Sequence, residues 1–375
     1  MRITYILTSL GVGGAERQVL WLGRRMARAG HTVQLVILLP RGADDLLSES
    51  AAETDSASLD VVYLGIQKTP WSALRGLVRG ASAVRQFRPD LIHTHNFHGN
   101  LAGRLLGWLC GGVPVISTIH NVYEGGRLRM LAYRVSDPFS RLTIAVSEAA
   151  RDRYVHLRAI AAGKAGVIAN GIETDNFFPS SERRDAMRAE MGVAENDFVW
   201  ITVGRLAPAK DYPNLLHAFS AIHPEQPAAK LWIIGAGEPS YTDELRKLSR
   251  KLGIEDRLRW LGARQDVAAL LDAADAFVLA SAWEGMPLAL GEAMAMAKPV
   301  VATDVGGVRE MAGHSKWLVE AGNSHALAEA MARMTTLSVD DRLKIGEASR
   351  TRILKQFSMN AKTREWEEIY RSVLK

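Results

Sequence analysis

Short apolar runs alternate with longer mixed segments along most of the chain. The runs are rich in β-branched residues, and each has the length of one buried strand. They cover residues 3–7, 33–39, 61–64, 91–93, 115–119 and 143–146 in the first half, and residues 198–203, 231–234, 258–261, 277–280 and 300–303 in the second. Strands that alternate with helices form βαβ units with parallel strands. The pattern therefore predicts two α/β sheets in tandem.

The segments between the runs predict helices. In residues 15–29, the apolar Val19, Leu22 and Met26 fall on one helical face, and Gly30 follows as the expected stop. Residues 42–60, rich in Ala, Ser, Asp and Glu, predict a surface helix or loop. Breaker residues place a domain boundary near residues 170–190. Open parallel sheets bind ligands at the carboxyl ends of their strands, so a cleft between the two domains is the expected active site.

Glu284 and Glu292 frame the most informative segment, which follows the apolar run at 276–280 and leads into a helical pattern. Pro287 suits the first helical turn, because its missing N–H would have no partner there. The free N–H groups and the helix dipole at such a turn favour a phosphate. The flanking carboxylates repel phosphate but accept hydrogen bonds from hydroxyls. A ligand with hydroxyl-bearing rings on both sides of a diphosphate, which is a nucleotide-sugar, fits this arrangement.

A glycine loop follows the first strand. A nicotinamide-binding fold would carry Gly-x-Gly-x-x-Gly there, whereas this chain has Gly11, Gly13 and then Glu16. The second strand also ends without an acidic residue to hold a ribose, so both departures argue against a dinucleotide. Gly13 and Gly14 can still offer N–H groups to a phosphate or an acceptor. The alternative is a tight strand-to-helix turn with no ligand.

Composition narrows the class of protein. The 375 residues suffice for two domains, and the 47% hydrophobic content is that of a soluble globular protein. No apolar run reaches the ~18 residues of a spanning helix. The first residues enter a strand pattern directly, so we expect no signal peptide. Cys110 is the single cysteine, which fits a reducing cytoplasm.

Charge is unevenly spread. Residues 1–170 carry 20 Lys and Arg against 12 Asp and Glu, a net +8, and residues 171–375 carry 26 against 29, a net −3. A basic half suggests an anionic membrane surface, nucleic acid or an acidic substrate, or else a solvated arginine-rich surface. Because no nucleic-acid motif appears and the basic residues are not interleaved with aromatics, we expect no nucleic-acid partner.

Further segments surround the two glutamates in a fixed order. They are the glycine loop at 11–17, Thr-Ile-His-Asn at 118–121, Asn-Gly-Ile at 170–172, Gly-Arg-x4-Lys-Asp at 204–211, and Phe357-Ser358 before an aromatic amphipathic segment. With Glu-x7-Glu, these segments resemble the retaining GT-B glycosyltransferases of the GT4 type over essentially the whole chain. The resemblance implies an α/β GT-B fold with two Rossmann-like domains facing each other across a cleft. It implies an acceptor domain at 1–170, a nucleotide-sugar domain at 171–356, and a helix at 357–375 that packs back toward the first domain.

The resemblance also implies roles for individual residues. Glu292 accepts hydrogen bonds from the ribose hydroxyls, Glu284 lies near the donor sugar, and Arg205 and Lys210 stabilise the diphosphate charge in place of a metal ion. The alternatives without a functional role are that Arg205 and Lys210 are ordinary surface cations and that Glu284 is a helix-flanking carboxylate that favours the helix dipole. The expected catalytic residues are His120, Glu284, Arg205 and Lys210, and those expected to bind the donor are Gly13, Gly14, Arg205, Lys210, Arg264, Gly285, Met286, Pro287, Leu288 and Glu292.

Four histidines follow strands of the first half. His120 ends the run at 115–119, where it can donate a hydrogen bond to the donor sugar or phosphate across the cleft, although an isolated histidine is more often structural. His93, His95 and His98 could suggest a metal site, but no clustered Cys or carboxylate accompanies them. The resemblance implies instead that this segment lines the acceptor side.

These observations predict a metal-independent enzyme without a cofactor that moves a hexose from a nucleoside diphosphate sugar, with UDP favoured over GDP, to a lipid-linked or growing saccharide with retention. The alternative is a transferase to a small soluble acceptor or a nucleotide-sugar epimerase on the same fold. Residues 71–79 and 101–109 combine Trp, Leu and Arg in a way that suits a membrane interface, or they are ordinary helices packed on the first sheet. We expect a cytoplasmic protein, with peripheral binding to the inner face of an anionic membrane as the extension of that hypothesis.

Overall fold

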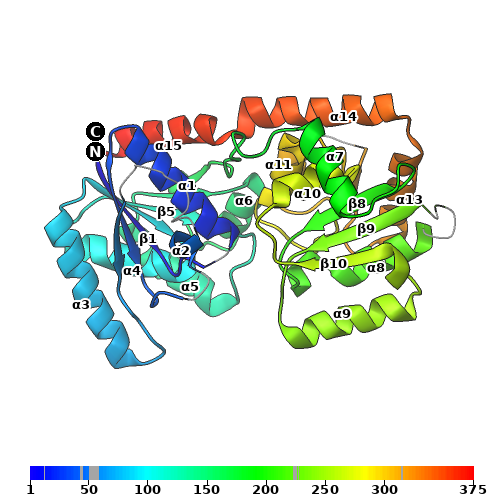
Figure 1. Cartoon of the computed structure of the whole chain (residues 1–375). Helices are drawn as coiled ribbons and strands as arrows, with labels where there is room; N and C mark the ends of the chain where they lie inside the picture. The colour runs from blue at the N-terminus through cyan, green and yellow to red at the C-terminus, as the bar shows by residue number, and fades with distance from the viewer. Residues whose placement is uncertain (12, 43–44, 50–58, 223–225, 227, 314–315) are drawn as a thin grey trace. The chain divides into compact units, whose positions relative to one another are not determined.

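The computed structural model describes residues 1–375 except 12, 43–44, 50–58, 223–225, 227 and 314–315. The chain folds into two compact units (Figure 1). Unit 1 comprises Met1–Gly171 together with Met359–Lys375, and unit 2 comprises Ile172–Ser358. The chain therefore leaves unit 1 once, builds all of unit 2, and returns.

Unit 1 is built on a sheet of seven parallel strands in the order β3-β2-β1-β4-β5-β6-β7. β1 pairs with both β2 and β4, so the order of the strands along the sheet reverses at β1. Ligands of open α/β sheets bind at such a position. The strands are β1 (Arg2–Leu7), β2 (Thr32–Ile37), β3 (Asp60–Tyr63), β4 (Leu91–His95), β5 (Val115–Ile119), β6 (Leu142–Ala145) and β7 (Ala165–Val167).

Helices cover both faces of this sheet. Successive side chains of a strand point to opposite faces, so Tyr5 packs in one core with α1 and α15, and Ile6 packs in another with α3 and α4. The helices are α1 (Gly14–Arg28), α2 (Leu46–Glu49), α3 (Pro70–Phe87), α4 (Asn96–Leu109), α5 (Arg127–Ser136), α6 (Glu148–His156) and α15 (Met359–Val373).

Local sequence explains where the longer helices start and stop. Thr69 caps α3 by accepting a hydrogen bond from the Ser72 N–H, and Pro70 takes the first helical position, which lacks an N–H partner in any case. After α1, Gly30 adopts a φ of 87°, which lets the His31 N–H close back on the Met26 carbonyl. The predicted stop at Gly30 is confirmed.

Unit 2 repeats the architecture with six parallel strands in the order β10-β9-β8-β11-β12-β13. Its core joins Trp200 of β8 and Val278 of β11 to Phe219 of α8, and Trp200 and Phe219 are fully buried. The strands are β8 (Phe198–Val203), β9 (Ala229–Ile234), β10 (Leu258–Gly262), β11 (Ala276–Leu279), β12 (Val300–Thr303) and β13 (Leu318–Val319). The helices are α7 (Ser181–Glu190), α8 (Tyr212–Ile222), α9 (Pro239–Lys251), α10 (Val267–Ala273), α11 (Leu288–Ala295), α12 (Val308–Ala312), α13 (Ser324–Thr336) and α14 (Val339–Arg352).

The last helix belongs to the core of unit 1. Trp366 and Tyr370 of α15 pack with Tyr5 and with the apolar face of α1. Hydrogen bonds fix the chain where it leaves unit 1 and where it returns. Gln18 of α1 exchanges two hydrogen bonds with the backbone of Gly171, at 2.5 and 2.8 Å. In unit 2, the Ile172 N–H donates to the Phe357 carbonyl at 2.7 Å.

The eleven predicted strands are confirmed, with small differences at their ends. The second strand ends at Ile37 rather than Leu39. Two strands, β7 and β13, were not predicted, because runs of three and two residues are too short to show a periodic pattern. Most of the predicted surface segment at 42–60 lies outside the described residues.

Candidate active site

The carboxyl ends of β8 and β9 bring two loops of unit 2 together. The Leu206 N–H donates to the Ala236 carbonyl at 2.8 Å, and Leu206 forms an isolated bridge with Gly237. A Cβ atom on Gly235 would collide with the carbonyl of Gly204, so only glycine allows this approach. Arg205 is exposed in this loop and, within the described part of the chain, makes no hydrogen bond or ion pair.

Lys210 and Glu284 form an ion pair where the segments that follow β8 and β11 meet. Lys210 Nζ lies 2.5 Å from Glu284 Oε1, and the Ser281 hydroxyl donates to the same oxygen at 2.7 Å. The Lys210 side chain passes 3.3 Å from where a Cβ atom of Gly204 would lie. The glutamate and the lysine predicted for the donor site therefore lie together, although 74 residues separate them in the chain.

The turn before α11 rests on two glycines of the next loop. The Gly307 N–H donates to the Gly285 carbonyl at 2.8 Å, and a Cβ atom on Gly306 would collide with the Glu284 carbonyl. Pro287 is the residue before α11, with φ −75° and ψ 115°, rather than a residue of its first turn. The prediction for Pro287 was wrong by one position, because an extended ψ suits the N-cap as well as proline's fixed φ suits the first turn.

Two other residues predicted to bind the donor differ in their surroundings. Glu292 lies in the second turn of α11 with 1% of its surface exposed. A buried carboxylate is costly unless hydrogen-bond donors face it, so this position requires donors around the Glu292 carboxyl group. Arg264 lies in the exposed loop after β10, where its guanidinium donates to both carboxylate oxygens of Asp266 at 2.8 and 2.6 Å. Donor binding through Arg264 would require this local pair to open.

A histidine cluster, His93, His95 and His120, lies at the carboxyl ends of β4 and β5 in unit 1. His95 Nδ1 and His120 Nε2 are 3.0 Å apart, so one of the two rings donates to the other. His93 is held by the Tyr370 hydroxyl at 2.6 Å and the Thr118 hydroxyl at 2.7 Å. His95 Nε2 and His120 Nδ1 are buried without a partner among the described residues. The Nε2 atom of His120 is therefore engaged with His95, and Nδ1 is the ring nitrogen that has no partner among the described residues.

Burial keeps this cluster uncharged. It lowers the pKa of His120 to about 4, and it lowers the pKa values of His93 and His95 well below their ordinary value, with the neighbouring rings adding to the effect. At neutral pH, each ring is a hydrogen-bond donor and acceptor and not a cation. Because both nitrogens of His93 already have partners, His93 is not available as a metal ligand.

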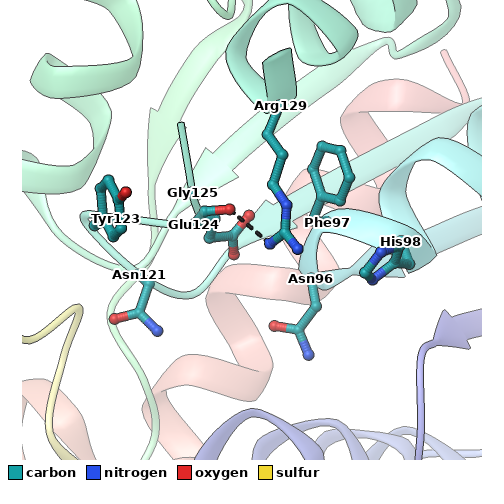
Figure 2. Close-up of a pocket in the computed structure, with 8 residues that line it drawn as sticks. All are labelled: Asn96, Phe97, His98, Asn121, Tyr123, Glu124, Gly125 and Arg129. Carbon is teal, nitrogen blue, oxygen red and sulfur yellow. Dashed lines mark hydrogen bonds between the residues drawn. The ribbon is translucent and has the colours of Figure 1, made fainter. Parts of the chain in front are cut away.

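A pocket of about 540 Å³ opens beside the cluster in unit 1 (Figure 2). The loop after β5 and the starts of α4 and α5 line it. Arg129 donates to the Glu124 carbonyl at 2.7 Å and lies 4.8 Å from the centre of the Phe97 ring. Tyr133 donates to Glu124 Oε2 at 2.5 Å. The lining residues are Asn96, Phe97, His98, Asn121, Tyr123, Glu124, Gly125 and Arg129.

Sequence reasoning missed most of this pocket, although a signal was present. Asn96 directly follows β4, and Asn121 follows β5 by two residues. The carboxyl ends of adjacent parallel strands meet at one edge of the sheet, so polar residues at both positions indicate a shared site. The positions of Arg129 and Glu124 in the sequence gave no indication of this site, because the contact between the two residues depends on the path of the loop at 121–126.

The remaining predicted residues are placed as follows. Gly13 is the N-cap of α1 and Gly14 its first residue, and a Cβ atom on Gly13 would collide with the Glu16 carboxylate. Across the described ranges, no group of three or more His, Cys, Asp or Glu residues is placed to hold a metal ion. In the same residues, every helix is too short or too polar to cross a membrane.

The fold and the strand-end polar residues define a class: two-domain α/β proteins that bind ligands at the ends of open parallel sheets. Solved structures of this class superpose on nearly the whole chain. HepE from Anabaena, in complex with UDP and glucose, has a TM-score of 0.87 at 22% identity and covers 99% of this chain and 100% of its own. A glycosyltransferase from Rickettsia africae has a TM-score of 0.86 at 22% identity, with 100% and 98% covered.

Two family models match consecutive parts of the sequence. Glycosyltransferase Family 4 matches residues 12–176, and Glycosyl transferases group 1 matches residues 183–352. The chain belongs to the GT-B glycosyltransferases of the GT4 type. The predicted family and α/β GT-B fold are confirmed.

Curated relatives act on different acceptors. An Escherichia coli UDP-Gal:alpha-D-GlcNAc-diphosphoundecaprenol alpha-1,3-galactosyltransferase is 26% identical over 79% of this chain and 79% of its own. A D-inositol 3-phosphate glycosyltransferase of Corynebacterium glutamicum is 29% identical over 89% and 86%. An N-acetyl-alpha-D-glucosaminyl L-malate synthase of Bacillus anthracis is 31% identical over 50% and 49%. The protein is a glycosyltransferase related to enzymes that use lipid-linked and small acceptors.

Proposed function

We propose that this protein transfers a hexose from a nucleoside diphosphate sugar, with UDP favoured, to a lipid-linked or growing saccharide in surface polysaccharide biosynthesis. The observation that carries the proposal is the meeting of Lys210 and Glu284 at the turn that opens α11. The Escherichia coli relative is named for UDP-Gal, and HepE was solved in complex with UDP and glucose, and both support the choice of base.

The unit 2 residues supply what a nucleotide-sugar needs. Glu292 accepts from the ribose hydroxyls, and Glu284 accepts from hydroxyls of the transferred sugar. The cations of Arg205 and Lys210 meet the charge that develops on the diphosphate as the glycosidic bond breaks. Lys210 then exchanges part of its contact with Glu284 for a phosphate oxygen, which leaves Glu284 available to the sugar.

The reaction proceeds with retention in this proposal, with the leaving phosphate taking the acceptor proton on the same face of the sugar. We expect the product of a reaction with a UDP-hexose and a saccharide acceptor to keep the anomeric configuration of the donor. The anomeric coupling constant in the proton NMR spectrum of the product, compared with that of the donor, measures this. Inversion would contradict the mechanism, and conversion of the donor without an acceptor would favour the epimerase.

The proposed reaction uses no metal ion, because Arg205 and Lys210 supply the positive charge. We therefore expect the initial rate to be unchanged, within about a factor of two, when excess EDTA is added. A metal-dependent glycosyltransferase assayed in the same buffer is the control for chelation. Complete loss of activity that Mg²⁺ or Mn²⁺ restores would contradict the proposed mechanism.

A small soluble acceptor is the second candidate, and the relatives from Corynebacterium and Bacillus favour it. The two candidates differ in whether the enzyme works at a membrane. Peripheral binding to the inner face of the cell membrane would bring unit 1 to a lipid-linked acceptor.

Three neighbouring helices of unit 1 support membrane binding. α3 and α4 pack together, as do α4 and α5. Residues 68–141 carry ten Lys and Arg against three Asp and Glu, so cations accompany the apolar surface. Leu128 is 83% exposed and Trp71 62% exposed, which is costly for apolar side chains facing water. The exposed apolar residues of the three helices are Trp71, Leu74, Val78, Leu105, Trp108, Leu109, Leu128, Leu131 and Val135.

We expect the protein to float with lipid vesicles, and the bound fraction to rise with anionic lipid and fall with salt. Leu128→Glu should reduce flotation severalfold, because it places a carboxylate on the apolar and cationic surface. Leu343→Glu on α14 of unit 2, a residue that is also exposed, is the matched control. An absence of flotation on every lipid composition would favour the small soluble acceptor.

A further inference from the structure

The pocket of unit 1 has a chemistry that selects between acceptors. We propose that it holds the terminal sugar ring of a saccharide acceptor as an uncharged, hydroxyl-bearing group, and that it discriminates against a ring that itself carries phosphate. This inference rests on the proposed glycosyltransferase function and adds the class of group that the acceptor presents.

Three polar side chains of the pocket are available to a ligand. Asn96, His98 and Asn121 line it from the start of α4 and the loop after β5, and their side chains make no hydrogen bond to the described residues. The carboxamides of Asn96 and Asn121 and the neutral imidazole of His98 each donate and accept hydrogen bonds, as a sugar hydroxyl does. Each of the three side chains can therefore bind the hydrogen or the oxygen of a hydroxyl group. Asn96 has a φ of 63°, a left-handed conformation that asparagine tolerates better than most residues.

The pocket has no excess of positive charge, because its lining pairs one permanent cation, Arg129, with one carboxyl group, Glu124. Arg129 donates to the Glu124 carbonyl and lies over the Phe97 ring, so its guanidinium is held by a backbone oxygen and an aromatic face. His98 adds no charge at neutral pH, because burial and the nearby Arg129 lower its pKa. A phosphate entering the pocket would therefore meet the Arg129 cation together with the Glu124 carboxyl group, and no net positive charge among the described lining residues.

The carboxyl group of Glu124 also acts against an anion. It lines the pocket and is fixed by the Tyr133 hydroxyl at 2.5 Å. A carboxylate accepts hydrogen bonds from sugar hydroxyls, whereas a phosphate beside it meets like charge in a partly desolvated place. The geometry thus favours hydroxyls and disfavours phosphate through the same group.

Size and shape agree with a sugar. A volume of about 540 Å³ lies in the range of small-molecule sites and exceeds what one hexose ring occupies. Tyr123, 52% exposed, borders the pocket in Figure 2 and offers an aromatic face for the C–H face of a ring.

Saturation-transfer NMR on the full chain, without a donor, tests the inference. The probes are N-acetyl-D-glucosamine and methyl β-D-galactopyranoside as uncharged sugars, and glucose 6-phosphate and myo-inositol 1-phosphate as charged ones. We expect transfer to at least one uncharged sugar and none to the charged probes. Asn121→Ala should weaken sugar binding about threefold to tenfold, the effect of losing one neutral hydrogen bond. Asn176→Ala, at an exposed position of unit 2, is the matched control and should leave binding unchanged.

Glu124→Gln tests the effect of the negative charge alone, because glutamine keeps the shape of the side chain and an acceptor oxygen for the Tyr133 hydroxyl. We expect this variant to retain the uncharged sugar and to gain measurable binding of a phosphorylated probe. The inference is overturned if the wild-type chain binds a phosphorylated probe more tightly than both uncharged sugars, if no uncharged sugar binds, or if Asn121→Ala has no effect.

The proposed function has a separate readout in the same samples. Thermal stabilisation by UDP, GDP, ADP or CMP reports on unit 2 and does not involve Asn121 or Glu124. Stabilisation by one of these nucleotides together with an unaltered sugar signal in Asn121→Ala would overturn the inference alone. If none of the four nucleotides stabilised the protein, the proposed function would fail regardless of the sugar result.

Discussion

Replacing both Arg205 and Lys210 by alanine is expected to lower kcat by at least two to three orders of magnitude, while the affinity for the nucleotide-sugar falls much less. The two cations meet charge that grows on the diphosphate during the reaction, so their loss raises the energy of the transition state more than that of the bound donor. Loss of one preorganised group of this kind costs about 10²- to 10³-fold in kcat. Steady-state kinetics with saturating acceptor measures the effect.

The structure supplies a further reason for a large effect at Lys210. Without the Lys210 ammonium 2.5 Å away, the carboxylate of Glu284 would face the diphosphate unneutralised. The matched control is Arg246→Ala with Lys247→Ala, which removes an Arg and a Lys exposed on α9 of the same unit. Turnover at the wild-type rate in the Arg205 and Lys210 double variant would remove both residues from the mechanism.

The second large effect is expected at Glu292. Glu292→Ala should weaken the binding of the nucleoside diphosphate by about 2–4 kcal/mol, or roughly 30- to 1,000-fold, because two hydrogen bonds from the ribose lose a charged acceptor. Titration calorimetry with UDP measures the change. The thermal stabilisation by UDP, about 2.7 kcal/mol at a hundredfold excess over the wild-type Kd, should fall below about 1 kcal/mol at the same concentration.

Controls separate this effect from a loss of folding. Glu292 is 1% exposed, so circular dichroism and the midpoint of thermal unfolding without nucleotide should be compared with the wild-type values. Glu244→Ala, at an exposed position of α9, removes the same group from the same unit and should leave UDP binding unchanged. Unaltered UDP affinity in a folded Glu292→Ala variant would contradict the ribose-binding role.

The strands were predictable because their apolar runs are long and local. The run at Phe198–Val203 is apolar except for Thr202 and is fully recovered as β8. The three residues of β7 carry no comparable signal, and a neighbouring strand decides their conformation. The position of Pro287 was missed by one residue, because its fixed φ is compatible with both sides of a helix start.

The candidate site was likewise predictable only in part: the residue types could be predicted from the sequence, but the contacts between them could not. The residue types at Lys210 and Glu284 were visible in the sequence as separate motifs, but their ion pair depends on the adjacency of β8 and β11 in the sheet. The contact of His95 with His120 depends likewise on the pairing of β4 with β5. The association of Arg264 with Asp266 is local, yet two nearby charges in a loop do not by themselves indicate a pair.

The return of the chain to unit 1 has a consequence for the order of synthesis. All seven strands of unit 1 have been synthesised once Val167 is added, but Trp366 and Tyr370 of α15 follow only after the whole of Ile172–Ser358. At about 5–20 residues per second, this interval is on the order of 10 to 40 s. During that time, Tyr5 and the apolar face of α1 lack the helix that covers them, and His93 lacks the Tyr370 hydroxyl. Nascent unit 1 thus exposes apolar surface of the kind that chaperones bind until α15 is made, and a ribosome that stops before α15 leaves the earlier-made domain as the unfinished one.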